Sequence, residues 1–276
     1  MGRALGAALR ARGHRVTGVR RDPARAAELA QVGIEPLALD LADRSAADRI
    51  PADVAAVVAC QAASGDGEEA YRAAYLEANR TLLAAAARLR LVAFVYTGST
   101  GVFGQRDGST VDESSAVQPA SRSAEVLVEA ERLVLGAVEQ GIPARLIRLS
   151  GLYGPGRTGV IERVRRGAMS LGPGDEAWTN WCHLDDAVAA VAAVVERGRD
   201  GGVYHGTDAH PARRREVVEW IAGRLGILPP RRSVAVPGGQ GGANRRVSGE
   251  RTRAELGLTL AFPSFREGLD RLLPPR

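Results

Sequence analysis

The sequence predicts an α/β fold in which helices cover a mostly parallel sheet. Helical patterns alternate with short apolar runs through the first half of the chain, as expected of βαβ units. Two of these runs, 54–60 (VAAVVAC) and 91–97 (LVAFVYT), are apolar almost throughout, which is typical of strands buried on both faces. With 276 residues, 45% of them hydrophobic, the chain can build one large or two modest domains.

The expected elements follow one another from the start of the chain. A first helix ends at Gly13, and Asp22 followed by Pro23 caps a second one. The expected helices are 2–12, 23–31, 67–89, 121–140, 184–197, 212–225 and 264–273, and the expected strands are 14–20, 37–40, 54–60, 91–97, 144–149 and 202–206. The segments 98–120 and 237–244 (PGGQGGAN) are expected loops.

Composition excludes several classes of function. The net charge is +5, but the arginines are dispersed and only 4% of the residues are aromatic, which argues against a nucleic-acid surface. The chain has neither a secretory signal nor a run near the roughly 18 apolar residues that span a membrane, so we expect a soluble, cytoplasmic protein. Cys60 and Cys182 lie far apart, so we expect small buried hydrophobes and no metal site.

All 37 residues counted as lysine plus arginine are arginine. The absence of lysine excludes every mechanism that needs an amine side chain, including Schiff-base chemistry and the lysine of a P-loop.

Several strings occur in one order along nearly the whole chain. They are GRALGAALRARGHRVTGVRRDP (2–23), VYTGSTGVFG (95–104), VDE (111–113), LSGLYGPGR (149–157), WCHLDDAVAAV (181–191), GVYHGTD (202–208), NRRVSGERTRAELG (244–257) and PSFREGL (263–269). This order resembles the extended and atypical short-chain dehydrogenases of the NAD(P)-dependent epimerase/dehydratase group. The resemblance implies a Rossmann-type doubly wound sheet in 1–150 and a smaller substrate-side region in 151–276, with 184–206 returning to the sheet.

One departure from this group concerns the start of the chain. Members begin with an apolar strand and a glycine-rich turn, commonly G-x-x-G-x-x-G, of which Gly2 matches only the last glycine. We expect that the protein starts upstream of Met1 and that its first strand is missing from this sequence. Because glycine backbone and a helix start normally hold the pyrophosphate, the chain as given should bind dinucleotide weakly or not at all.

Arg20 and Arg21 end the second strand of the resembled fold, where an acid would accept the ribose hydroxyls of NAD. A guanidinium instead matches the 2′-phosphate of NADP through paired, charge-assisted hydrogen bonds. The resemblance therefore favours NADP, with NAD possible. The other interpretation is a solvated strand end with ordinary surface charge.

Other residues at strand ends are expected to line the cofactor. Asp40 and Leu41 resemble the acid-plus-apolar step beside the adenine, although Asp40 could instead cap the next turn. The remaining expected cofactor residues are Gly2, Cys60, Gln61 and Thr97.

The catalytic residues of this group are only partly present. Short-chain dehydrogenases use a Ser or Thr with a Y-x-x-x-K pair, and Ser99 or Thr100 supplies the hydroxyl here. Ser123 stands where the tyrosine belongs and Leu127 where the lysine belongs. Tyr153 faces the expected substrate side and could act as the acid, or it could be a packing residue of its turn.

Two further sets of residues have open interpretations. His183 and the pair Asp185–Asp186 either position the following helix, with one aspartate as N-cap, or do acid–base work. Trp178 and Trp181 either line a substrate pocket or belong to the core.

Two functions therefore compete. The first is an NAD(P)-binding oxidoreductase or epimerase-like enzyme that acts on a sugar nucleotide or another small carbonyl or hydroxyl compound. The second is a catalytically silent NADP-binding sensor or scaffold, favoured by the missing Tyr and Lys. A basic interaction protein is a remote third. The expected partner is a small molecule, with neither nucleic acid nor membrane, and the sequence does not indicate an oligomeric state.

Overall fold

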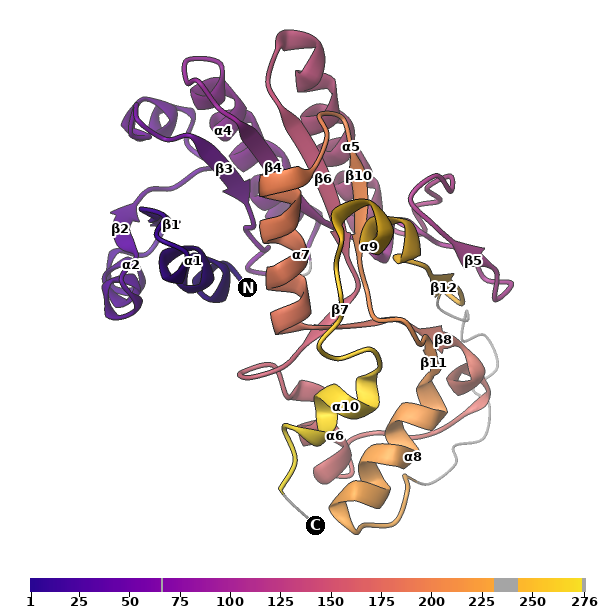
Figure 1. The fold of residues 1–276 in the computed structure, drawn as a ribbon. Helices are drawn as coiled ribbons and strands as arrows, with labels where there is room; N and C mark the ends of the chain where they lie inside the picture. The colour runs from indigo at the N-terminus through magenta and orange to yellow at the C-terminus, as the bar shows by residue number, and fades with distance from the viewer. Residues whose placement is uncertain (66, 231–242, 275–276) are drawn as a thin grey trace. The chain divides into compact units, whose positions relative to one another are not determined.

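The computed structural model describes residues 1–65, 67–230 and 243–274 (Figure 1). Most of the expected loop 237–244 lies outside these residues. The chain divides into two compact units, each built from three stretches of sequence. Unit 1 comprises Met1–Val102, Ser121–Arg148 and Val188–Tyr204, and unit 2 comprises Phe103–Ala120, Leu149–Ala187 and His205–Arg276.

A four-stranded sheet with the order β10-β6-β4-β3 forms the centre of unit 1. Its strands are β3 (Ala56–Ala59), β4 (Ala93–Ser99), β6 (Ala144–Leu149) and β10 (Val203–Gly206), the last reaching into unit 2. β3 runs parallel to β4, with Ala56 beside Ala93. A separate parallel pair joins β1 (Thr17–Arg20) to β2 (Glu35–Ala38). These elements confirm the predicted α/β fold with a parallel sheet.

The two apolar runs that predicted buried strands differ in their burial. Ala93–Tyr96 in β4 are fully buried, as predicted, whereas Ala56, Val57 and Val58 in β3 are only half-buried, so that prediction was wrong for β3. The pairing explains the difference: among the described residues β4 lies between two strands, while β3 pairs only with β4 and β1 only with β2. These edges of β1 and β3 are where the expected leading strand would pair, and that strand stays a prediction.

The helices of unit 1 are close to the predicted ones, with one correction. They are α1 (Gly2–Ala11), α2 (Pro23–Ala27), α3 (Glu68–Tyr71), α4 (Ala78–Ala86), α5 (Arg122–Gly136) and most of α7 (Leu184–Arg197). The single helix predicted over 67–89 is interrupted by a π-helical turn, Arg72–Glu77. The Asn79 side chain donates to the Tyr75 carbonyl oxygen (2.8 Å) and so satisfies an acceptor within this widened turn.

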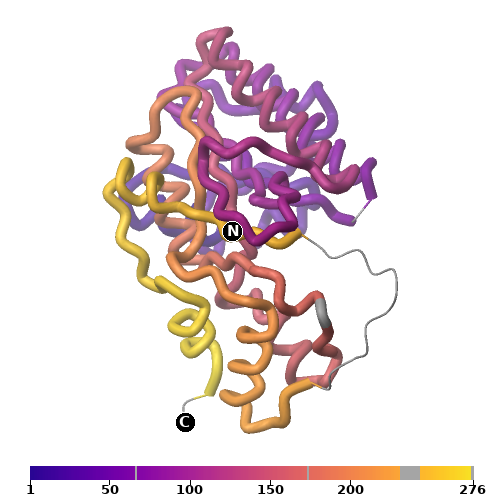
Figure 2. Tube along the Cα trace, turned by 90° about the vertical axis from the view of Figure 1, so that its right-hand side faces the viewer, coloured from indigo at the N-terminus to yellow at the C-terminus, as the bar shows by residue number. Residues whose placement is uncertain are grey.

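The described part of unit 2 consists mainly of short strand pairs and helices. β7 (Gly151–Tyr153) pairs with β9 (Trp181–His183), β8 (Trp178–Thr179) with β11 (Ala212–Arg213), and β5 (Thr110–Val111) with β12 (Arg246–Val247). The helices are α6 (Gly159–Arg165), α8 (Arg214–Leu225), α9 (Glu250–Leu256) and α10 (Phe265–Asp270). α8 and α10 lie side by side (Figures 1 and 2) and are joined by an Arg224–Asp270 ion pair at 2.6 Å.

A buried ion pair fixes α5 to the sheet of unit 1. Arg148 of β6 donates through Nε and Nη2 to the two carboxylate oxygens of Glu131 in α5, at 3.0 and 2.9 Å. Both side chains are at most 8% exposed. Burial raises the pKa of Glu131, and the Arg148 hydrogen bonds act in the opposite direction. Removing one partner would therefore leave an uncompensated buried charge.

We expect Arg148→Met to lower the free energy of unfolding by about 3–5 kcal/mol at neutral pH, the usual cost of breaking a buried pair. Because burial alone would then act on Glu131, its folded-state pKa should rise further above the unfolded value, and the loss should shrink as pH falls. Urea denaturation across pH measures both effects. The role of the Arg148–Glu131 pair would be contradicted if the loss of unfolding free energy were no larger than that of the exposed control Arg122→Met, or if this loss did not vary with pH.

Candidate functional site

The first turn of α1 lies directly against the end of β3. A Cβ atom on Gly2 would lie 2.9 Å from the Cys60 Sγ, so a larger residue here would require the Cys60 side chain or the helix start to shift. Within the described part of the chain no side chain caps this turn, and the turn has no acidic residue. The N–H groups of such a turn favour an anion. A pyrophosphate therefore fits this position, where two of the residues expected to bind a cofactor come together.

The arginines expected at the second strand of the fold lie at the end of β1. Arg20 is half-buried and Arg21 is exposed, and neither forms an ion pair with any residue that the structure describes. The nearby Asp22 carboxylate instead accepts hydrogen bonds from the Ala24 and Arg25 amides at the start of α2 (2.8 and 3.1 Å). Both guanidinium groups therefore keep donors for a phosphate.

Arg20 also acts on the end of β3. Burial raises the pKa of the Cys60 thiol, and the positive charge of Arg20 is among the groups that oppose this rise. A thiol whose pKa is raised is a poor nucleophile. Cys60 is half-buried, whereas the sequence predicted a buried residue, and its contact with a cofactor stays a prediction.

Asp40 and Leu41 already have structural roles. The Asp40 carboxylate accepts a hydrogen bond from the Ala42 amide at 3.0 Å, which favours the turn-capping interpretation of this residue. Leu41 packs, partly buried, against the hydrophobic core of unit 1. A contact of either residue with adenine stays a prediction.

Gln61 and Thr97 hold the segment that follows β3. The Gln61 Nε2 donates to the Asn79 Oδ1 at 3.3 Å, and the Thr97 hydroxyl donates to the Ala59 carbonyl oxygen at 3.2 Å. The Tyr75 hydroxyl accepts from the Ala63 amide at 3.4 Å. Asn79 and Tyr75 were missed in the sequence. The signal that could have found Asn79 is its place on the apolar face of α4, where it is fully buried.

The expected catalytic hydroxyl groups lie at the end of β4. Ser99 is half-buried and its Oγ accepts a hydrogen bond from the Gly101 amide at 3.0 Å, which leaves its proton available to a ligand. Thr100 is buried at the start of a 3-10 turn, Thr100–Val102. A Cβ on Gly98 would lie 3.3 Å from the Glu131 Oε1, so the strand end lies close to the buried ion pair.

The positions of the family's tyrosine and lysine lie at the start of α5. Ser121 caps this helix by accepting from the Ala124 amide at 3.2 Å, so the helix begins where the resemblance placed it. Ser123 is half-buried in the first turn, and Leu127, one turn on, is buried with its apolar neighbours. Neither side chain can supply the phenol or the charge of the family's pair.

Tyr153 belongs to the core of unit 2. It is 1% exposed, its hydroxyl donates to the Ser264 carbonyl oxygen at 3.3 Å, and its ring meets His183 and Trp181 edge to face. Burial raises its pKa far above the ordinary value for tyrosine. This geometry favours the packing interpretation, and a catalytic role for Tyr153 stays a prediction.

His183, Asp185 and Asp186 position their surroundings. The His183 Nδ1 accepts from the Asp185 amide at 3.2 Å, and burial lowers the pKa of the imidazole. Asp186 accepts from the Ala261 and Phe262 amides at 2.8 and 3.0 Å. Asp186 therefore ties down the segment before α10, a structural role that differs from the predicted helix cap.

Asp208 is a buried acid that the sequence did not single out as a titratable group. It is 2% exposed, and burial raises its pKa to about 8, with Glu267 and Asp186 adding to the rise while the His210 amide and Arg253 oppose it. The elements packed around it contribute Tyr153 and Cys182, whose pKa values are also raised mainly by burial. Burial in unit 2 therefore favours the neutral form of the Asp208 carboxyl group.

No helix among the described residues has the length and apolar character to cross a membrane. In this part of the chain we also find no cluster of three or more His, Cys, Asp or Glu side chains arranged to hold a metal ion.

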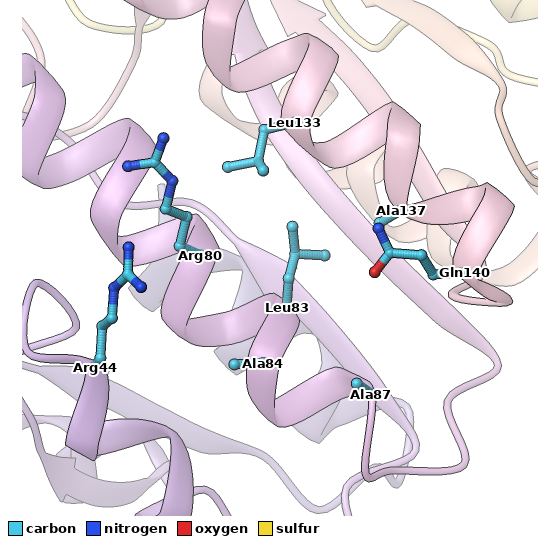
Figure 3. Close-up of a pocket in the computed structure, with 8 residues that line it drawn as sticks. All are labelled: Arg44, Arg80, Leu83, Ala84, Ala87, Leu133, Ala137 and Gln140. Carbon is cyan, nitrogen blue, oxygen red and sulfur yellow. The ribbon is translucent and has the colours of Figure 1, made fainter.

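A groove of about 430 Å³ lies between α4, α5 and the 3-10 turn Arg44–Arg49 in unit 1 (Figure 3). Its lining residues are Arg44, Arg80, Leu83, Ala84, Ala87, Leu133, Ala137 and Gln140. Helices of a parallel α/β unit run opposite to its strands, so the C-terminal ends of α4 and α5 lie toward the amino ends of the strands. The groove is therefore distinct from the start of α1 with Gly2 and from the ends of β1 and β4, which carry Arg20 and Ser99.

Residues 1–205 match the family described as "NAD dependent epimerase/dehydratase family". The chain belongs to this family. It is 30% identical to protein YeeZ of Escherichia coli strain K12, over 95% of this chain and 93% of that protein. It is 31% identical to a 3-diazoavenalumate denitrifying reductase of a Streptomyces species, over 98% of this chain and 96% of that enzyme.

A solved structure agrees in fold. MoeE5, solved in complex with UDP-glucuronic acid and NAD, superimposes with a TM-score of 0.82, covering 97% of this chain and 92% of that protein at 22% identity. The family and this fold confirm the Rossmann-type sheet and an NAD(P)-linked oxidoreductase or epimerase-like function.

We predict that ionisation of Asp208 destabilises the protein. Its folded-state pKa of about 8 lies above the usual value near 4, so stability should be full at acidic pH and should fall as pH rises from about 4 to about 8. Asp208→Asn should remove most of this slope, as measured by thermal or urea unfolding across pH. The exposed control Asp185→Asn should keep it. A slope that survives in Asp208→Asn would contradict the prediction.

Proposed function

We propose that this family member is an NADPH-dependent reductase of a small molecule and that it works without the family's Tyr–Lys pair. The observation that carries the choice of cofactor is the pair Arg20 and Arg21, unengaged by any carboxylate that the structure describes, at the end of β1. The relative named as a reductase, similar over nearly its whole length, supports reduction as the reaction. A cytoplasmic location is part of this proposal.

The described residues fit such a cofactor. The close approach at Gly2 brings the uncapped start of α1 to the end of β3, where the pyrophosphate would lie, and Arg20 and Arg21 would hold the 2′-phosphate. When bound, NADPH supplies a hydride. The Ser99 hydroxyl, which accepts from Gly101, can donate its proton in a hydrogen bond that orients a substrate oxygen or nitrogen.

The absence of the Tyr–Lys pair separates reduction from epimerisation. An epimerase needs a base that removes a proton and returns it, and Ser123 and Leu127 offer neither a phenol nor a cation at the family's positions. A reduction whose product takes its proton from water, or needs none from the protein, has no such requirement. This difference favours a reductase within the family.

A second candidate is a catalytically silent NADPH-binding sensor or scaffold. It is favoured by Ser123 and Leu127, which stand at the positions of the family's tyrosine and lysine. Continuous oxidation of NADPH across a panel of carbonyl and other unsaturated small compounds distinguishes the candidates. Turnover supports the reductase, whereas tight binding without oxidation of any member supports the sensor.

The arginine pair should select between the two dinucleotides. We expect Arg20→Ala combined with Arg21→Ala to weaken NADPH binding by about 10- to 100-fold and to leave NADH nearly unchanged, since charge-assisted hydrogen bonds contribute about 1.5–3 kcal/mol. Calorimetry on the protein as the cell makes it measures both affinities. Arg25→Ala removes an equal charge from α2 and should change neither. Equal losses for NADPH and NADH in the double variant would refute the assignment of the 2′-phosphate to these arginines.

Ser99 should matter to turnover and not to cofactor affinity. Ser99→Ala should lower kcat/KM by about tenfold to a hundredfold, because one hydrogen bond to the reacting group is lost, while the NADPH affinity stays the same. Tyr153→Phe keeps the ring in the core of unit 2 and should retain most of the activity. The opposite pattern, with Ser99→Ala active and Tyr153→Phe inactive, would transfer the acid role to Tyr153.

A further inference from the structure

Two guanidinium groups lie over one indole ring in unit 2. The Arg213 Cζ is 4.5 Å from the centroid of the Trp178 ring, and the Arg246 Cζ is 5.4 Å from it. Trp178, Arg213 and Arg246 are here called the Trp178 platform. The sequence left Trp178 open between pocket and core. Its ring is half-buried, and it does not belong to the described cluster that contains Tyr153, Ile161 and Val217.

The backbone fixes the platform from three strands. Arg213 and Trp178 are direct cross-strand partners in the β8–β11 pair, and Arg246 lies on β12, opposite Thr110 of β5. Asn244 links the two pairs: its Oδ1 accepts from the Trp178 amide at 2.9 Å, and its carbonyl oxygen accepts from the Gly108 amide at 2.9 Å. The three side chains are thus placed in advance of any ligand.

Arg213 and Arg246 use few of their N–H donors in hydrogen bonds with the described residues. The Arg246 Nε donates to the Gly108 carbonyl oxygen at 3.1 Å, and Arg213 donates to the Glu176 carbonyl oxygen. A guanidinium has five N–H donors, and stacking on a ring engages only its face. Several in-plane donors of each arginine therefore stay available at the edge of the ring.

Positive charge is in excess at the platform. Arg246 forms no ion pair with any residue that the structure describes, and it is exposed. The carboxylate near Arg213 belongs to Glu176 at 3.9 Å, and Arg215 binds the same carboxylate at 2.7 Å. Two cations held near one ring repel each other, and an oxyanion that receives hydrogen bonds from both would relieve the repulsion.

We propose that the Trp178 platform binds an oxyanion, a carboxylate or a phosphate, attached to a planar or apolar body that contacts the indole. Arg213 and Arg246 are binding residues in this proposal, and Trp178 supplies the surface for the body of the ligand.

Three probes test the proposal without turnover: benzoate, phenyl phosphate and the uncharged benzamide, each titrated into the protein by calorimetry at low salt. We expect at least one of the two anions to bind, and benzamide to bind at least tenfold more weakly. Arg213→Gln and Arg246→Gln should each weaken the anion by about tenfold or more, and added salt should weaken it in the wild type. Arg163→Gln, which removes an exposed arginine from α6, is the matched control and should have no effect.

The outcomes distinguish a carboxylate from a phosphate ester, and they separate binding at the platform from binding of the cofactor. Binding of benzoate alone indicates a carboxylate, binding of phenyl phosphate alone indicates a phosphate ester, and both support the platform. Equal binding of benzamide, no binding of either anion, or equal losses in Arg163→Gln would overturn it. NADPH affinity measured on the same samples reports on the proposed function independently, because neither glutamine variant alters β1 or α1.

Discussion

The close approach of α1 to β3 at Gly2 is the constraint on which the candidate cofactor site depends. A Cβ atom at this position would lie 2.9 Å from the Cys60 sulfur, so glycine lets the helix start lie against the strand end without a shift of Cys60. This approach gathers an uncapped helix start, the end of β1 with its arginines, and the segment after β3. In the proposed function, the backbone N–H groups of the helix start would hold the pyrophosphate, and the guanidinium groups of Arg20 and Arg21 would hold the 2′-phosphate.

The helix and strands of unit 1 that would hold the family's proton-transferring residues are present. Ser121 caps the start of α5, and the buried Glu131–Arg148 pair fixes this helix to β6. The pair lies close to Gly98 at the end of β4. Ser123 and Leu127 occupy the expected turns of this helix. The departure from the family is therefore chemical: the scaffold that would place a tyrosine and a lysine is present, and other side chains stand on it.

Periodicity and capping residues in the sequence predicted most of the elements of the fold. The helix over 184–197 has the predicted ends, and the strand over 144–149 agrees as well. The half-buried state of β3 could not be predicted, because an apolar run reports a residue's preference and not whether a neighbouring strand is there to cover it. The π-helical turn at Arg72–Glu77, where the Asn79 amide donates to the Tyr75 carbonyl oxygen, was equally hidden, since the helical periodicity continues through this segment.

The features of the candidate site were likewise only partly predictable from the sequence. The places of Gly2, Arg20 and Ser99 at strand or helix ends were predictable because the family order defines these ends, while their contacts with a ligand stay predictions. The raised pKa of Asp208 and the Trp178 platform were not, because they arise from contacts between segments far apart in the sequence, such as Trp178 with Arg246.

The most direct test of the central claim is the affinity of the protein, as the cell makes it, for NADPH and NADH, measured by calorimetry under identical conditions. The account predicts one binding site with NADPH bound at least tenfold more tightly, since only NADPH carries the phosphate that Arg20 and Arg21 can hold. No binding of either dinucleotide, or tighter binding of NADH, would contradict it.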